Sequence, residues 1–168
     1  AIVRSNPEEH QVRALIVYPM NALINSQEQA LNNFLKNLPS SKVRFDQYTG
    51  QTRQEDRQRI LDDPPHILLT NYVMLEYLLM RSSERQLLQQ ATQYLDFLVT
   101  DELHFYRGRQ GADVAMLMRR VAQKSGQGVQ YIGTSATMTT EGDRDHRRQA
   151  VARVATTQFG VPVKPENV

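Results

Sequence analysis

Five short apolar segments alternate with stretches of helical or charged character along the 168-residue chain. They lie at residues 13–18, 43–48, 66–70, 96–100 and 129–133. A parallel connection between two strands needs a crossover long enough to hold a helix, so strands separated by helices pair in parallel. The sequence therefore predicts an α/β fold, with a parallel sheet of about five strands and helices on both faces.

Turn residues and helical spacing set the expected boundaries between these segments. A helix is expected over 21–38, where apolar residues recur every three or four positions. A second helix is expected over 71–80, capped by Asn71 and apolar on most sides, so we expect it to be sandwiched between layers. Gly108 and Gly111 are expected to bracket a loop. An amphipathic helix then follows, whose apolar face carries Val114, Leu117, Met118 and Val121.

The composition excludes several kinds of site from this chain. It has no cysteine, which rules out disulfides, thiolate zinc sites and thiol catalysis and is compatible with the cytoplasm, where we expect the protein to act. No apolar stretch approaches the roughly 20 residues of a membrane span, so we expect no membrane partner. The net charge of +2 gives no global positive field, although most of the cations are arginines, which suit bidentate phosphate contacts.

Two adjacent carboxylates follow the fourth apolar segment. Asp101 and Glu102 come directly after Thr100, and His104 lies two positions further on. Ligands bind at the carboxyl ends of the strands in sheets of this kind, so these acids are expected at a ligand site. Adjacent acids at that edge suit Mg²⁺ and the activation of water in nucleotide hydrolysis. The alternative is a pair of solvated acids beside a surface histidine with no catalytic role.

Several short motifs, in order along the chain, resemble those of one enzyme family. Residues 18–23 with Gln27 are similar to motif Ia, 48–50 to motif Ib, 70–79 to the following DNA-side motif, 101–104 to motif II and 135–137 to motif III. The chain thus resembles the first RecA-like domain of superfamily 2 helicases of the DEAD/DEAH-box type. Its motif Ia and its 72–77 stretch are most similar to Lhr-like and mitomycin-repair-like bacterial helicases. The resemblance implies a partial RecA-like domain of the P-loop NTPase type over residues 1–168, carrying motifs Ia to III.

The resemblance assigns ATP and Mg²⁺ to the acidic motif. Asp101 would hold Mg²⁺, through a water molecule, and Glu102 would be the base that orients or activates the attacking water. His104 would relay the nucleotide state to motif III. Ser135 and Thr137, whose hydroxyls can bond His104 or Asp101, would couple hydrolysis to domain movement. The alternative for these two hydroxyls is an ordinary cap on a strand-to-helix turn.

Other strand ends are expected to contact nucleic acid. Backbone amides, hydroxyls and a helix N-terminus at such ends can hold the phosphates of one strand, which reads the backbone and gives little sequence preference. The alternative for each residue is a turn or a helix cap. The expected contacts are Pro19, Asn21, Gln27, Thr49, Gly50, Thr70 and Asn71.

No phosphate loop accompanies these motifs, because the chain contains no G-x-x-x-x-G-K-[ST] sequence. In the family this loop precedes motif Ia and a second RecA-like domain follows motif III, so we expect the chain to be a segment of a longer polypeptide. The implied function is ATP-dependent unwinding of, or movement on, single-stranded or duplex nucleic acid, with DNA favoured. One alternative is a nucleic-acid-binding or docking module with a degenerate ATPase fold. Another is a motor domain in a restriction or phage-defence complex. The implied strand order runs from the motif III strand through those of motif II, motif Ia and Thr70 to the 43–48 strand.

Overall fold

The computed structural model describes residues 10–38, 42–126, 128–136 and 143–168. Within these residues, five parallel strands form one sheet in the order β2-β3-β1-β4-β5. The strands are β1 (Ala14–Tyr18), β2 (Phe45–Tyr48), β3 (Ile67–Asn71), β4 (Phe97–Thr100) and β5 (Gln130–Gly133). The helices are α2 (Asn21–Lys36), α3 (Gln54–Asp62), α4 (Tyr72–Met80), α5 (Arg85–Gln93), α6 (Gly108–Lys124) and α7 (Arg144–Phe159). Short 3-10 turns are η1 (Ser82–Glu84), η2 (Leu103–Phe105) and η3 (Pro165–Asn167).

The sheet confirms both the predicted fold class and the strand order implied by the resemblance. In the register of the central strand β1, Val17 faces Thr70 of β3 on one side and Thr100 of β4 on the other. Thr100 in turn faces Gly133 of β5. Because all the strands are parallel, the residues that follow them meet along one edge of the sheet. The chain places its predicted motifs at that edge.

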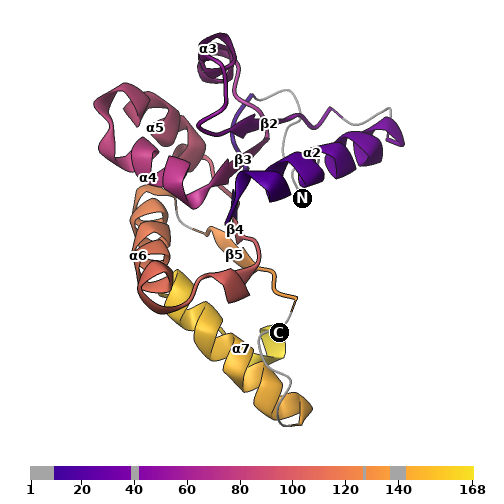
Figure 1. Cartoon of the computed structure of the whole chain (residues 1–168), viewed down its shortest axis with the longest axis vertical. Coiled ribbons are helices and arrows are strands. Elements are labelled where there is room, and N and C mark those ends of the chain that lie inside the picture. Colours follow the sequence, from indigo (N-terminus) through magenta and orange to yellow (C-terminus); the bar gives the residue numbers. More distant parts are fainter. Residues whose placement is uncertain (1–9, 39–41, 127, 137–142) are drawn as a thin grey trace.

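Helices cover the sheet unequally on its two faces (Figure 1). The larger core lies on the side of α4, α5 and α6, where Leu15, Leu75 and Met118 are buried in one cluster. On the other side, α2 contributes Ile24 to a small cluster with Tyr18 and Leu69. Of the described α2 side chains, Ile24 alone is buried, which leaves most of that helix open to solvent. None of the helices in the described ranges is both long and apolar enough to cross a bilayer.

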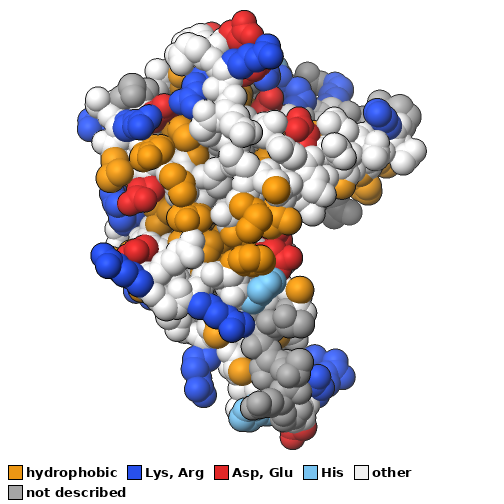
Figure 2. Space-filling model, in the orientation of Figure 1, with side chains coloured by type: hydrophobic (Ala, Val, Ile, Leu, Met, Phe, Trp, Pro, Cys, Tyr) orange, Lys and Arg blue, Asp and Glu red, His pale blue; other side chains and the backbone are white. Residues whose placement is uncertain are grey.

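Helix α4 is less enclosed than its sequence predicts. Met74 and Leu75 are buried, but Val73, Tyr77 and Met80 are exposed by 39%, 37% and 59%. The expectation of a sandwiched helix was wrong because neighbours cover one face only. Figure 2 shows apolar side chains gathered in this region of the surface.

The segment bracketed by Gly108 and Gly111 forms the first turn of α6 and is not a loop as expected. Gly108 takes a positive φ of 57°, and the helix continues directly from it. Gly111 is buried against the preceding turn, where a Cβ atom would lie 2.4 Å from the carbonyl oxygen of Tyr106. The glycine at 111 therefore serves close packing of backbone on backbone, and no loop is needed to explain it.

Gly111→Ala should destabilise the protein, because the added methyl group meets backbone atoms that cannot rotate away. We expect the free energy of unfolding to fall by about 1–3 kcal/mol. Gly50→Ala is the matched control, since a Cβ atom at Gly50 has nothing within 4 Å. Urea titration of the two variants measures the difference. Equal stability of both would contradict the packing argument.

Candidate nucleotide and nucleic-acid site

The acidic motif sits where β4 ends between two neighbouring strands. The amide of Asp101 donates to the carbonyl of Val17 in β1, at 2.9 Å. On the other side, the amide of Thr134, just past β5, donates to the carbonyl of Thr100 at 3.1 Å. Strand pairing therefore fixes the backbone of Asp101 relative to both neighbours.

Glu102 adopts a left-handed backbone conformation, with φ 54° and ψ 55°. It is the only non-glycine residue with a positive φ in the part of the chain that the structure describes. Such a conformation costs about 1–2 kcal/mol and persists only where its surroundings hold it. Two bonds to Thr134 do so: the Glu102 amide donates to its hydroxyl at 3.0 Å, and the Leu103 amide donates to its carbonyl at 2.8 Å. A strained acid at a strand end indicates a functional site.

Side chains of the β4 and β5 ends form one polar cluster. Glu102 Oε2 lies 2.9 Å from Nδ1 of His104, and Oγ of Ser135 lies 3.3 Å from the same nitrogen. The hydroxyl of Thr134 donates to Asp101 Oδ1. Ser135 thus lies beside His104, one of the two partners that the sequence left open for its hydroxyl.

The sequence prediction for this cluster omitted one residue and included one that lies outside the described part of the chain. Thr134, which our reading of the sequence missed, bonds both acidic residues of the motif. Its signal was a hydroxyl residue immediately after a strand that neighbours the acidic one. Thr137 lies outside the described residues, so its predicted coupling role stays a prediction.

Three other strand ends at the same edge of the sheet line a groove of about 350 Å³. Pro19 and Asn21 follow β1, Gly50 follows β2, and Asn71 ends β3. The Asn71 side chain donates to Asn21 Oδ1 at 2.5 Å and accepts from the Met74 amide at 2.7 Å. The predicted nucleic-acid residues of three separate motifs thus form one surface, and Asn71 caps α4 as expected.

The remaining predicted contacts are placed elsewhere. Thr49 and Thr70 are buried, at 2% and 0% exposure. The Thr49 hydroxyl accepts from the Gln51 amide at 3.1 Å, and the Thr70 hydroxyl donates to the Tyr48 carbonyl at 2.7 Å. These two buried hydroxyls therefore stabilise the backbone at the strand ends through hydrogen bonds within the protein. Gln27 is exposed on α2, about 9 Å along the helix axis from Asn21.

Two buried tyrosines lie in the electrostatic field of Asp101. Burial raises the pKa of Tyr18 to about 12, and the negative charge of Asp101 adds to this shift. Burial likewise raises the pKa of Tyr106, with Asp101 again contributing. A third buried tyrosine, Tyr48, has its pKa raised by burial and by Glu84. Two of these three tyrosines therefore lie close enough to Asp101 for its charge to act on them.

These tyrosines should resist ionisation in alkali. In the unfolded chain they ionise near pH 10.0, whereas in the fold Tyr18 ionises at about pH 12. Below pH 10, Tyr18 is neutral in both states and leaves the free energy of unfolding unchanged. As the pH rises from 10 towards 12, Tyr18 ionises in the unfolded chain before it does in the fold, so the free energy of unfolding falls. Phenolate absorbance should show a late-titrating class in the native protein that is absent in guanidinium. Titration of all seven tyrosines in one step would contradict this environment.

The sequence model of the DEAD/DEAH box helicases matches residues 1–144. The chain belongs to the DEAD/DEAH box helicase family. Within the family it is 33% identical over 120 residues to the uncharacterized ATP-dependent helicase MJ1574 of Methanocaldococcus jannaschii, a match over 70% of this chain and 17% of that protein. It is 31% identical over 152 residues to the ATP-dependent helicase hrq1 of Schizosaccharomyces pombe, over 88% of this chain and 14% of that protein.

Solved helicase structures share the fold. The crystal structure of the DUF1998 helicase MrfA bound to DNA and AMPPNP superposes with a TM-score of 0.72 and 27% identity. The match covers 97% of this chain and 21% of the MrfA chain. The chain thus spans about a fifth or less of these helicases.

The acidic cluster suits Mg²⁺ together with a phosphate-bearing ligand. In the described residues, no group of three or more His, Cys, Asp or Glu side chains converges as an all-protein metal cage. Mg²⁺ keeps several waters and usually takes one or two carboxylates plus substrate phosphates. A single carboxylate such as Asp101, fixed by the Thr134 hydroxyl, matches that mode of binding.

Proposed function

We propose that this chain is the motif Ia to motif III segment of an ATP-dependent helicase or translocase that couples ATP hydrolysis to movement on, or unwinding of, DNA. The observation that carries the proposal is the cluster at the ends of β4 and β5. There, Asp101, Glu102 and His104 contact Thr134 and Ser135 at the same sheet edge as the groove of Asn21 and Asn71.

Each residue of the cluster takes a proposed role in hydrolysis. Asp101 would hold Mg²⁺ through a water molecule, and the ion would supply positive charge that offsets the charge of the phosphates. Glu102 accepts a proton from the attacking water or orients it. The Ser135 hydroxyl and Nδ1 of His104, 3.3 Å apart, pass the state of the acidic motif to the β5 end. Thr137 is proposed to share this coupling role.

The nucleic-acid strand is proposed to lie along the groove of Pro19, Asn21, Gly50 and Asn71. Contacts from backbone and amide groups there would read the phosphate backbone and not the bases. DNA is favoured because the MrfA structure, which is 27% identical, is bound to DNA. The phosphate loop and a second RecA-like domain are proposed to come from other parts of the same polypeptide.

DNA-stimulated ATPase activity of the intact polypeptide tests this proposal. We expect turnover that needs Mg²⁺ and rises with single-stranded DNA, with DNA affinity falling as salt rises. The isolated 168-residue segment should hydrolyse almost no ATP, since it contains no phosphate-loop sequence. Binding of DNA without any turnover by the intact polypeptide would favour the degenerate docking module. Rapid hydrolysis by the segment alone would contradict the proposed division of the site.

A further inference from the structure

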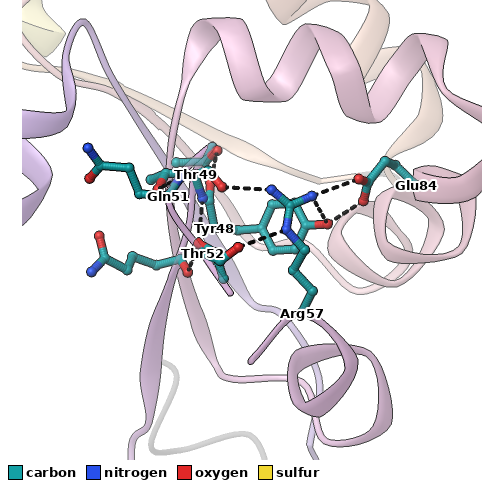
Figure 3. Close-up of polar contacts among 8 residues, drawn as sticks. Tyr48, Thr49, Gln51, Thr52, Arg57 and Glu84 are labelled. Carbon is teal, nitrogen blue, oxygen red and sulfur yellow. Dashed lines mark hydrogen bonds and ion pairs between the residues drawn. The ribbon is translucent and has the colours of Figure 1, made fainter. Parts of the chain in front are cut away.

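One arginine of α3 bonds both ends of the loop that follows β2 (Figure 3). Nε of Arg57 donates to the carbonyl of Thr52 at 3.0 Å. Nη2 of the same guanidinium donates to the carbonyl of Thr49 at 3.1 Å. The planar guanidinium can serve two acceptors in fixed directions, so it sets the separation of these two carbonyls.

The other side of the guanidinium bonds the 3-10 turn η1, which follows α4. Arg57 Nη1 donates to Glu84 Oε1 at 2.9 Å, and the two side chains are only 17% and 12% exposed. The guanidinium carbon also lies 4.9 Å from the centre of the Tyr48 ring, whose hydroxyl donates to Glu84. The charge of Arg57 is therefore neutralised inside the protein, and its donors are directed at protein acceptors.

Further hydrogen bonds fix the loop of residues 49–52, which carries one exposed glycine at its tip. The Thr49 amide donates to the Thr52 hydroxyl at 2.9 Å, and that hydroxyl donates to the Gln47 carbonyl at 3.1 Å. Gly50, at the tip, is exposed and lines the groove described above. A Cβ atom at Gly50 would meet nothing within 4 Å, so the fold does not itself need a glycine there. Space left open at the groove suits a backbone that approaches an external ligand.

We propose that Arg57 is a positioning residue for nucleic-acid binding, which fixes the loop of Thr49 to Thr52 so that the backbone at Gly50 meets a phosphate of the bound strand. This inference rests on the proposed function. Arg57 acts through the loop and does not touch the nucleic acid. Lysine at this position keeps the charge but cannot donate to two carbonyls in a fixed fork.

Arg57→Lys in the intact polypeptide tests the proposal, with a fluorescent single-stranded oligodeoxythymidine as the probe. We expect the dissociation constant to rise about tenfold, because a displaced loop weakens the charge-assisted hydrogen bond between the backbone at Gly50 and a phosphate. The slope of log affinity against log salt should stay unchanged even in Arg57→Gln, which removes the charge, because Arg57 makes no contact with a phosphate. ATP turnover without DNA should also stay unchanged, while the DNA concentration for half-maximal stimulation rises by the same factor.

Arg59→Lys is the matched control on the same helix. Arg59 pairs with Asp46, Nη2 to Oδ1 at 2.6 Å, and its bonds go to side chains and not to the loop carbonyls. We expect its dissociation constant to stay within about twofold of the wild type, as for a partly exposed ion pair.

Each of four results would overturn the inference. Equal affinity of the two lysine variants would remove Arg57 from its positioning role while leaving the proposed function intact. A fall of about one in the salt slope of Arg57→Gln, which removes the charge, would mean that Arg57 contacts a phosphate directly. Absence of DNA binding by the wild type would remove the proposed function, and this inference with it. If Arg57→Lys does not fold, Glu84→Gln takes its place. A rise of about threefold in the dissociation constant of Glu84→Gln would support the proposal. A dissociation constant equal to that of the wild type would overturn it.

Discussion

Replacing Glu102 with glutamine should lower ATP turnover by the intact polypeptide about 10²–10⁴-fold, the usual contribution of a general base. Glutamine has the same size and retains an oxygen that can face His104, now 2.9 Å from Glu102 Oε2. It cannot accept a proton from water. The left-handed backbone at 102 is held by Thr134 through main-chain amides, so it should survive the change. The loss should therefore appear in kcat and leave ATP affinity intact.

Steady-state kinetics and equilibrium binding of an ATP analogue separate these two quantities. Glu76→Gln is the matched control, because Glu76 is exposed on α4 and belongs to no part of the acidic cluster. Its turnover should equal that of the wild type. Normal turnover in Glu102→Gln would exclude Glu102 as the base.

Thr134→Val should lower turnover about 10²-fold, because it removes the hydroxyl that holds both members of the acidic motif. Valine has nearly the same shape as threonine, so packing changes little. The Glu102 amide loses its acceptor at 3.0 Å, and Asp101 loses the donor that fixes its carboxylate. Misplacing a catalytic group by about 1 Å is enough to produce a loss of this size.

Thr134→Ser provides the control, since serine retains the hydroxyl and should restore most of the turnover. The Mg²⁺ concentration needed for half-maximal activity should rise in the valine variant and not in the serine variant. Thr134 is exposed, so both variants should melt close to the wild type. Equal activity of valine and serine variants would show that the hydroxyl has no part in the site.

The sequence determined the fold class and the edge of the sheet that carries the site. These follow from short-range information: segment length, apolar spacing and the residues directly after each strand. The resemblance to DEAD/DEAH-box helicases added the strand order, and the β2-β3-β1-β4-β5 sheet confirms it. Asp101, Glu102 and His104 could be predicted as one group because they lie within four consecutive residues.

Only the tertiary structure decided which side chains complete that site. Thr134, just past β5, bonds Glu102, just past the neighbouring β4. Arg57 reaches Thr49 and Glu84 from a separate helix. The same holds for the open face of α4 and for Gly111, whose close neighbour is the carbonyl of Tyr106. These contacts depend on the distance between segments after packing. The spacing of residues along one segment carries no information about that distance. The distance between two segments is set by how they and their neighbours pack.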